Sequence, residues 1–370
     1  MNEFFINKPD NIITPCLTIE ILDKSDAIEY HKSLPVYKAT PIVSLPNLAK
    51  KYGVGNIYVK DESHRFGLNA FKGLGASYAI HKVLEQNPDV ETFCTATDGN
   101  HGKAVAWAAR ISGKKAVIFV PNDTTEDRIR AISNEGAEVI QTEFNYDITC
   151  DIAVETSAKN GWQLVQDTAL ENYIEIPAQI MAGYLTMLKE LEDSLNILPK
   201  PKADIVFLQA GVGSFAGSAI WYYLKRYGKA RPKIVIVEPS EADGIIASFK
   251  ANKRVGSDCS FNTIMAGLNC GIPSLTAWDI IKSGADISIK VDDVFAEQAI
   301  RELYYPQGGD TRIIAGESGA AGLAGLIAIM KTSGFKPLIK ELNISPESRI
   351  LLFNTEGATD LKNFNKIISQ

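Results

Sequence analysis

The sequence lacks the features of a membrane protein and of a secreted, disulfide-linked domain. Its five cysteines are an odd number, and their spacings match neither a zinc site nor a dense disulfide framework. The segment 1–10 has no basic stretch followed by an apolar one, and no apolar run approaches the roughly 18 residues of a membrane span. We therefore expect reduced cysteines, no metal site, no membrane partner and a cytoplasmic location.

A concentration of positive charge is also missing. The formal net charge is −6 and no basic patch stands out, which argues against a nucleic-acid partner and favours a small molecule. With 370 residues, of which 45% are hydrophobic and 22% are charged, the chain has the composition of a globular protein long enough for two domains.

Strands and helices are expected to alternate along most of the chain. The expected strands cover residues 56–60, 92–96, 116–120, 138–142, 162–166, 204–209, 234–238 and 349–353. The expected helices cover residues 71–86, 103–111, 126–134, 148–160, 176–195, 218–227, 295–305 and 320–330. This alternation predicts an α/β fold whose sheets are mainly parallel and twisted, with helices on their faces. We expect a large domain of residues 1–74 and 191–370, and a smaller inserted domain of residues 75–190.

One lysine, Lys72, stands among small and apolar residues where a helix is expected to begin. In a partly dry pocket desolvation disfavours the ammonium form, so the neutral amine becomes available to form a Schiff base. A lysine taken alone is usually a solvated surface cation. Lys72 becomes a candidate for a covalent anchor only because of the motifs that follow it.

A glycine-rich loop, Gly211-Val212-Gly213-Ser214, follows an apolar strand and leads into a helix. Its backbone N–H groups and the positive end of the helix would converge on a phosphate group. The same pattern, followed by a strand and then Glu238, also resembles a dinucleotide-binding site with its ribose-binding acid. That alternative leaves Lys72 and Asn100 without a role. No Gly-Lys-Ser/Thr closes the loop, so a nucleoside-triphosphate loop is excluded.

A second loop, Thr97-Asp98-Gly99-Asn100-His101-Gly102, also joins a strand to a helix. Its N–H groups could hold a substrate carboxylate, while Asn100 donates to a cofactor oxygen. A structural alternative remains open, in which Asp98 or Asn100 is a helix cap and His101 is a packed side chain.

The order of these motifs resembles that of fold-type II pyridoxal-phosphate enzymes, the group of tryptophan synthase β and threonine dehydratase. The resemblance spans residues 41–360 and includes the late Thr355-Glu356-Gly357. Four longer stretches are more specific, because they are similar to those of the diaminopropionate ammonia-lyases: 66–72, 95–102, 165–169 and 263–268.

The resemblance implies pyridoxal 5'-phosphate as the cofactor. Lys72 would hold it as a Schiff base, Asn100 would contact its phenolic oxygen, and residues 211–214 would surround its phosphate. Thr355 would face the pyridine nitrogen. A hydroxyl there leaves the ring less protonated than a carboxylate would, which favours loss of a β-substituent over transamination.

The resemblance also implies a substrate with a second amine. Threonine dehydratases usually carry serine where this chain has Asp98, and a carboxylate there can take the Cα proton or pair with a second ammonium. Asp98 would act on the D-isomer and Lys72 on the L-isomer. Asp167 would contact the distal amine or share the role of base, unless it is only a cap of the local turn. Thr97 and His101 complete the expected substrate contacts.

We therefore expect a homodimeric carbon–nitrogen lyase that converts D- and L-2,3-diaminopropionate to pyruvate and two molecules of ammonia through aminoacrylate. Within the same fold, a serine or threonine dehydratase or a β-replacement synthase is the alternative. A catalytically silent protein that binds amino acids or the cofactor is the alternative outside enzymes, and the intact Lys72 argues against it.

Overall fold

The computed structural model describes residues 3–97, 99–195 and 203–370, so Asp98, a candidate from the sequence, lies outside the described residues. The chain forms two compact units. The first unit comprises Met1–Pro15, Ala39–His64 and Met187–Gln370, and the second comprises Cys16–Lys38 and Arg65–Thr186. Among the described helices, none combines the length and the apolar character that crossing a bilayer requires.

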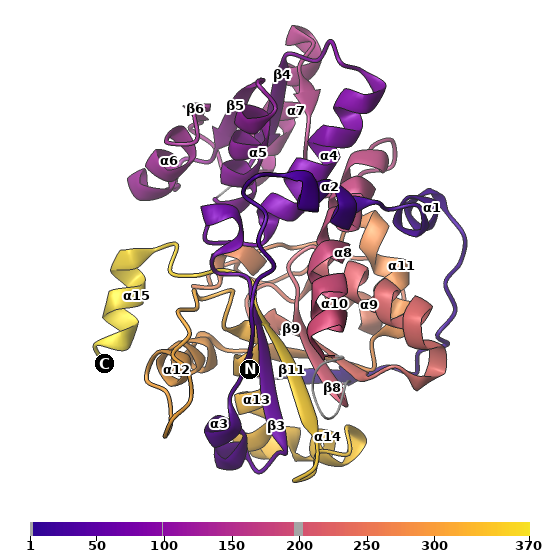
Figure 1. The fold of residues 1–370 in the computed structure, drawn as a ribbon, viewed down its shortest axis with the longest axis vertical. Helices are drawn as coiled ribbons and strands as arrows, with labels where there is room; N and C mark the ends of the chain where they lie inside the picture. Colours follow the sequence, from indigo (N-terminus) through magenta and orange to yellow (C-terminus); the bar gives the residue numbers. More distant parts are fainter. Residues whose placement is uncertain (1–2, 98, 196–202) are drawn as a thin grey trace. The chain divides into compact units, whose positions relative to one another are not determined.

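The first unit is built on a sheet for which seven strands are described, in the order β1-β10-β9-β8-β11-β3-β2. The strands are β1 (Glu3–Ile6), β2 (Ile42–Ser44), β3 (Asn56–Asp61), β8 (Ile205–Gln209), β9 (Lys233–Pro239), β10 (Ile287–Val291) and β11 (Arg349–Asn354). The inner strands pair in parallel, as β3, β11 and β8 show side by side in Figure 1. Only the edge strands β1 and β2 are antiparallel to their neighbours. The inner strands are mainly buried, and β8 and β9 in particular are mostly apolar, as expected where helices cover both faces of a parallel sheet.

Helices of the first unit cover this sheet. They are α3 (Pro46–Tyr52), α9 (Ser214–Tyr227), α10 (Gly244–Ala251), α11 (Leu275–Gly284), α12 (Asp293–Tyr304), α13 (Ala321–Lys331), α14 (Lys336–Glu341) and α15 (Leu361–Ile368). Helix α13 is apolar along almost its whole length, and its small residues bring its backbone close to the strands. A Cβ atom on Gly325 would lie 2.6 Å from Val237 Cγ2. This helix therefore fills the centre of the core.

The second unit has a sheet for which four strands are described, in the order β6-β5-β4-β7, all parallel. The strands are β4 (Thr92–Ala96), β5 (Lys115–Val120), β6 (Glu138–Gln141) and β7 (Gln163–Leu164). The helices are α1 (Leu17–Asp23), α2 (Ala27–Ser33), α4 (Lys72–Gln86), α5 (Asn100–Ile111), α6 (Glu126–Ser133), α7 (Tyr146–Asn160) and α8 (Glu175–Leu195), the last of which continues into the first unit. Helices α5 and α7 pack on β4 and β5.

The units divide the chain at positions that differ in detail from the predicted domains. Residues 16–38 and 65–74, which we assigned to the large domain, belong to the second unit. His31 in α2 shows why, because this fully buried side chain contacts Thr186 Oγ1 at 2.7 Å and the Leu74 carbonyl oxygen at 3.1 Å. Such a long-range polar contact leaves no periodic signal in the sequence.

The predicted fold class is confirmed, because both units are mainly parallel sheets flanked by helices. All eight predicted strands overlap strands of the structure, although β7 spans only Gln163–Leu164. Strands β1, β2 and β10 were not predicted from the sequence. Helix α9 begins at Ser214 rather than at residue 218, so the glycine loop runs directly into the first turn of the helix.

Candidate active site

Lys72 and Asp167 form an ion pair in the second unit. Lys72 is the first residue of α4, and its Nζ lies 2.6 Å from Asp167 Oδ2. The two side chains are 19% and 12% exposed. Burial alone would raise the pKa of the Asp167 carboxyl, but the attraction of the Lys72 ammonium outweighs burial and holds that pKa well below its ordinary value. Asp167 is therefore a carboxylate at any physiological pH, and it stands beside the amine that the sequence singled out.

The segment before Lys72 is held in an unusual backbone conformation. Phe66 has φ of 53° and Asn69 has φ of 60°, in the left-handed region that bulky residues rarely adopt. The Phe66 ring stacks on Trp107 of α5, with 4.9 Å between the ring centroids. Strain of this kind costs about 1–3 kcal/mol per residue and persists only where the surroundings hold it in place. Stacking on α5 thus fixes the turn from which Lys72 projects.

The loop after β4 caps helix α5 through Thr97, which the sequence did not suggest as a cap. Thr97 Oγ1 accepts hydrogen bonds from the N–H groups of Gly99, at 3.0 Å, and of Gly102, at 3.2 Å. The two candidates were Asp98, which lies outside the described residues, and Asn100, which is the half-buried first residue of α5. Asn100 is therefore inside the helix rather than at its cap.

His101 faces the same ion pair. Its Nε2 lies 2.7 Å from the Val165 carbonyl oxygen, and because a carbonyl only accepts, this nitrogen carries the hydrogen. Burial lowers the pKa of His101 although Asp167 acts in the opposite direction, so the ring is neutral. Its Nδ1 is buried without a hydrogen-bond partner in the described part of the chain and lies 3.9 Å from Asp167 Oδ2. The ring therefore offers an unused acceptor next to the carboxylate.

Gln166 positions Asp167, although no sequence pattern singles it out. Its Oε1 accepts hydrogen bonds from Thr95 Oγ1 at 2.6 Å and from the Ala96 N–H at 3.1 Å. Gln166 thus joins the end of β4, which leads to the loop with His101, to the segment that carries Asp167. An amide side chain before an aspartate has no distinctive spacing, so only the structure reveals this role.

The glycine loop lies in the first unit, at the carboxyl end of β8. Gly213 has φ of +90°, and a Cβ atom there would lie 2.6 Å from Ile281 Cδ1. A Cβ atom on Gly211 would lie 3.1 Å from Cys270 Sγ. Helix α9 begins at Ser214, so the positive end of its dipole lies at this loop. The loop is therefore a narrow cradle of backbone donors that suits a phosphate group.

Thr355 follows β11 in the first unit, and Gln209 at the end of β8 orients its hydroxyl. Gln209 Nε2 lies 2.9 Å from the Phe353 carbonyl oxygen and 3.0 Å from Thr355 Oγ1. Two more carbonyl oxygens, of Ser318 and Gly319, lie within 3.3 Å of the same nitrogen. Since only a donor fits among these carbonyl oxygens, the Thr355 oxygen accepts from the amide. The hydroxyl hydrogen of Thr355 then remains available for another acceptor.

Comparison with known proteins identifies the family. Residues 34–339 match the model of the family described as pyridoxal-phosphate dependent enzyme. This chain belongs to that family. It is 39% identical to the diaminopropionate ammonia-lyase of Escherichia coli strain K12, over 92% of this chain and 90% of the relative. It is 38% identical to that of Salmonella typhimurium strain LT2, over 93% of this chain and 91% of the relative.

The family match extends to solved structures. The crystal structure of Escherichia coli diaminopropionate ammonia lyase with an aminoacrylate-PLP azomethine reaction intermediate aligns with a TM-score of 0.92 at 37% identity. That alignment covers 100% of this chain and 97% of the other. Threonine deaminase isoform 2 from Solanum lycopersicum aligns with a TM-score of 0.80 at 22% identity, which shows the shared fold. Fold type II and pyridoxal 5'-phosphate as cofactor, both expected from the sequence, are confirmed.

The residues of this pyridoxal-phosphate-dependent enzyme suit its cofactor. The glycine cradle at Gly211 and Gly213 has no room for side chains and presents backbone donors, as a phosphate requires. Thr355 is 4% exposed, and its hydroxyl hydrogen could be donated to a ring nitrogen. In the second unit, Lys72 is an amine that could hold the cofactor as a Schiff base. The candidates thus fall into two sets, one in each unit.

Glu238 explains why the dinucleotide alternative fails. Its two carboxyl oxygens accept hydrogen bonds from the N–H groups of Ile245, at 2.7 Å, and Ile246, at 2.9 Å, in the first turn of α10. The side chain is 1% exposed. Glu238 therefore caps a helix, and it is not placed to bind a ribose. Burial raises the pKa of Glu238 to about 8 in spite of these hydrogen bonds.

This raised pKa predicts a pH-dependent stability. The folded protein keeps a proton on Glu238 up to about pH 8, whereas the unfolded chain loses it near 4.5. Because the native state binds the extra proton between these values, rising pH removes stability there. Glu238→Gln cannot ionise, so its stability relative to the native protein should increase from about pH 5 to about pH 8. Urea unfolding at both pH values measures this, with the exposed Glu347→Gln as control; a constant difference would contradict it.

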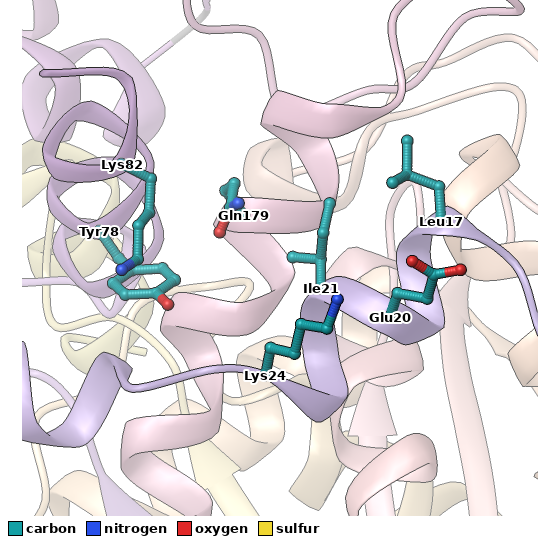
Figure 2. Close-up of a pocket in the computed structure, with 7 residues that line it drawn as sticks. All are labelled: Leu17, Glu20, Ile21, Lys24, Tyr78, Lys82 and Gln179. Atoms are coloured by element: carbon teal, nitrogen blue, oxygen red, sulfur yellow. The ribbon is translucent and has the colours of Figure 1, made fainter. Parts of the chain in front are cut away.

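A separate pocket lies in the second unit (Figure 2). Its volume is about 270 Å³, and it is lined by Leu17, Glu20, Ile21, Lys24, Tyr78, Lys82 and Gln179. Two of its polar groups already have partners within the unit. Tyr78 Oη donates to Asp26 Oδ1 at 2.6 Å, and Lys82 Nζ lies 3.0 Å from the same oxygen. Tyr78 and Lys82 are thus bound to Asp26, and Lys72 is not among the residues that line this pocket.

Proposed function

We propose that this enzyme eliminates the β-amine of 2,3-diaminopropionate, from both the D- and the L-isomer, to give pyruvate and two molecules of ammonia. The observation that carries the proposal is the buried Asp167 carboxylate, which stays ionised beside Lys72. A fixed negative charge beside the amine that holds the cofactor selects a substrate that brings a second positive charge. The diaminopropionate ammonia-lyases to which this chain is similar support the same assignment.

In this proposal both sets of residues contribute contacts to the cofactor. Lys72 binds it covalently, Asn100 donates to its phenolic oxygen, and the loop of Gly211, Val212, Gly213 and Ser214 binds its phosphate. The free hydroxyl hydrogen of Thr355 is donated to the ring nitrogen. When bound, pyridoxal phosphate supplies an electron sink for the charge that develops as Cα loses its proton.

Proton transfer belongs to the residues of the chain. The neutral amine of Lys72 takes the Cα proton of the L-isomer, and Asp98 takes that of the D-isomer. The electrons of the Cα–H bond form the double bond between Cα and Cβ, and the Cβ–N bond breaks with its pair leaving on ammonia. The released enamine takes up water and yields pyruvate and the second ammonia.

Asp167 and His101 bind the distal amine in this proposal. The substrate ammonium takes the place of the Lys72 ammonium on Asp167, and the unused Nδ1 of His101 accepts a hydrogen from it. Thr97 contributes through the backbone, because its hydroxyl caps α5 and thereby shapes the loop that faces the substrate carboxylate. A hydroxyl substrate such as serine brings no second charge and would leave Asp167 unused.

Product release from purified protein loaded with pyridoxal phosphate tests the function. We expect pyruvate and ammonia in the ratio of one to two from D- and L-diaminopropionate, and much slower release from serine and threonine. Release from serine or threonine alone would mean a dehydratase of the same family. No release from any of the four would overturn the assignment to elimination altogether.

Gly213→Ala tests the phosphate loop. An alanine there must adopt φ of +90° and clash with Ile281, so we expect affinity for pyridoxal phosphate to fall by about tenfold or more, together with thermal stability. Gly228→Ala is the matched control, because Gly228 has φ of +52° with nothing within 4 Å of the added Cβ. The Gly228→Ala variant should be less stable than the native protein but should keep its affinity for the cofactor. Cofactor titration by absorbance measures both, and equal affinities in the two variants would argue against the phosphate assignment.

We also propose a homodimer in a reducing compartment such as the cytoplasm. All five cysteines are thiols in the structure, as expected where thiols are kept reduced. Light scattering on the purified protein measures the mass of the assembly, and a monomer at micromolar concentration would contradict the dimer.

A further inference from the structure

The hydroxyl of Tyr184 is a buried polar group that the proposed mechanism leaves unused. Tyr184 lies in α8 and is 1% exposed. Within residues 3–97, 99–195 and 203–370 its hydroxyl hydrogen has no acceptor, and Lys72 is the neighbour that can donate to its oxygen. A buried donor without an acceptor costs about 1–3 kcal/mol, and native structures keep few of them. The position of this one therefore calls for a functional explanation.

The ring of Tyr184 packs on the face of α4 that carries Lys72. Its centroid lies 4.7 Å from that of Phe71. A Cβ atom on Gly75 would lie 2.7 Å from Tyr184 Cε1 and 2.9 Å from Cζ, the atom that bears the hydroxyl. Lys72 and Gly75 are three residues apart and so share one face of the helix. The absence of a side chain at Gly75 lets the hydroxyl end of the ring sit beside Lys72.

Electrostatic effects agree with this placement. Burial raises the pKa of Tyr184 to about 12, while the Lys72 ammonium lowers it and the Asp167 carboxylate raises it. The hydroxyl therefore keeps its hydrogen at every physiological pH and can donate it. Lys72 as an ammonium paired with Asp167 has no lone pair to accept that hydrogen. The ammonium can only donate to the Tyr184 oxygen, so the hydroxyl hydrogen of Tyr184 has no acceptor on Lys72 in the state that the structure describes.

The situation changes when Lys72 loses its proton. On the proposed function, the distal ammonium of the substrate occupies Asp167, and Lys72 then lacks the carboxylate that stabilises its charge. A neutral amine exposes a lone pair, which the Tyr184 hydroxyl can hydrogen-bond without leaving its position. That hydrogen bond stabilises the neutral amine and restricts its rotation.

We propose that Tyr184 is a positioning residue for Lys72, with a hydroxyl that donates to the neutral amine and orients it for removal of the Cα proton of the L-isomer. The inference rests on the proposed function, in which Lys72 serves the L-isomer and Asp98 serves the D-isomer. It therefore predicts an effect on one stereoisomer only, which a structural role in packing would not produce.

Tyr184→Phe tests the inference, because it removes the hydroxyl and keeps the ring. We expect unchanged cofactor content and an unchanged or higher melting temperature, since a buried donor without an acceptor is lost. For L-diaminopropionate, kcat should fall by about 10- to 100-fold at constant KM, whereas for the D-isomer it should change by less than about twofold. The rise of kcat with pH for the L-isomer should move to higher pH, because the neutral amine loses its donor.

Tyr78→Phe is the matched control. Tyr78 is also 1% exposed, lies in α4 and donates to Asp26, so its loss should lower stability without distinguishing the isomers. An equal fall for both isomers in Tyr184→Phe, no fall for the L-isomer, or loss of the cofactor would overturn the role of Tyr184. A native protein that releases no pyruvate from either isomer would overturn the proposed function itself, and the inference with it.

Discussion

Asp167→Asn should lower kcat/KM for both isomers of diaminopropionate by about 10²- to 10³-fold, the range expected when one partner of a buried charge pair is removed. The amide keeps the shape of the side chain but not its charge, so the distal ammonium of the substrate would enter the site without a counter-charge. Serine and threonine bring no such ammonium, and any residual activity toward them should change much less. The ratio of activities on diaminopropionate and serine is therefore the informative quantity.

Steady-state rates of pyruvate release measure this ratio. Asp127→Asn is a suitable control, because Asp127 is 74% exposed and lies 3.9 Å from Arg130 on the surface of α6. Its loss should change rates by less than about twofold, since surface ion pairs contribute little. A uniform decrease for every substrate in Asp167→Asn would indicate that Asp167 acts on the reaction and not on the choice of substrate.

The lowered pKa of Asp167 also predicts how acid changes the stability of the PLP-free protein. The pKa of Asp167 is lowered in the folded state, so its ion pair contributes stability above the unfolded pKa of about 3.9. That contribution is lost as pH falls through the folded value. Asp167→Asn should therefore be less stable than the native protein at neutral pH, and the difference should shrink in strong acid.

Much of the fold followed from the sequence because its signals are local. The strand predicted at 204–209 is apolar over residues 205–208, and the glycines after it mark a turn, so β8 and its loop were predicted together. Lys72 was predicted at a helix start, and α4 begins at that residue. Strand β10, in contrast, was not predicted, and it follows α11 after only two residues, which leaves little sequence to separate the two elements. Edge strands β1 and β2 are too short to give a periodic pattern.

The supporting residues of the site could not be predicted, for a different physical reason. Gln166, Gln209 and Tyr184 act on groups that are distant along the chain or lie on other elements. Glutamine and tyrosine are common in cores and loops, and the hydrogen bonds that give these residues a role form only after the sheets have assembled. A sequence motif indicates the backbone conformation that a ligand requires. The partners that orient each functional group, in contrast, come together only in the tertiary structure.

Lys72→Ala should abolish turnover, with a loss of about 10⁴-fold or more, because the chain would lack both its covalent anchor and the base for the L-isomer. Borohydride treatment of the loaded native protein, followed by mass analysis of its peptides, should place the cofactor on Lys72. The variant should show no such adduct. Lys82→Ala is the control on the same helix and should retain both the adduct and the activity. An adduct on another lysine in the native protein would contradict the assignment.

Measuring the stability of Lys72 variants separates the role of this residue in folding from its role in catalysis. Lys72→Ala leaves Asp167 as a buried charge without its ammonium partner, which should cost about 3–5 kcal/mol in the free energy of unfolding. Adding Asp167→Asn removes that charge, so the double variant should recover most of the lost stability while remaining inactive. Urea unfolding of the PLP-free proteins measures this cycle. Additive losses in the double variant would mean that the 2.6 Å contact between Lys72 and Asp167 contributes nothing to folding, and that the pair exists for catalysis alone.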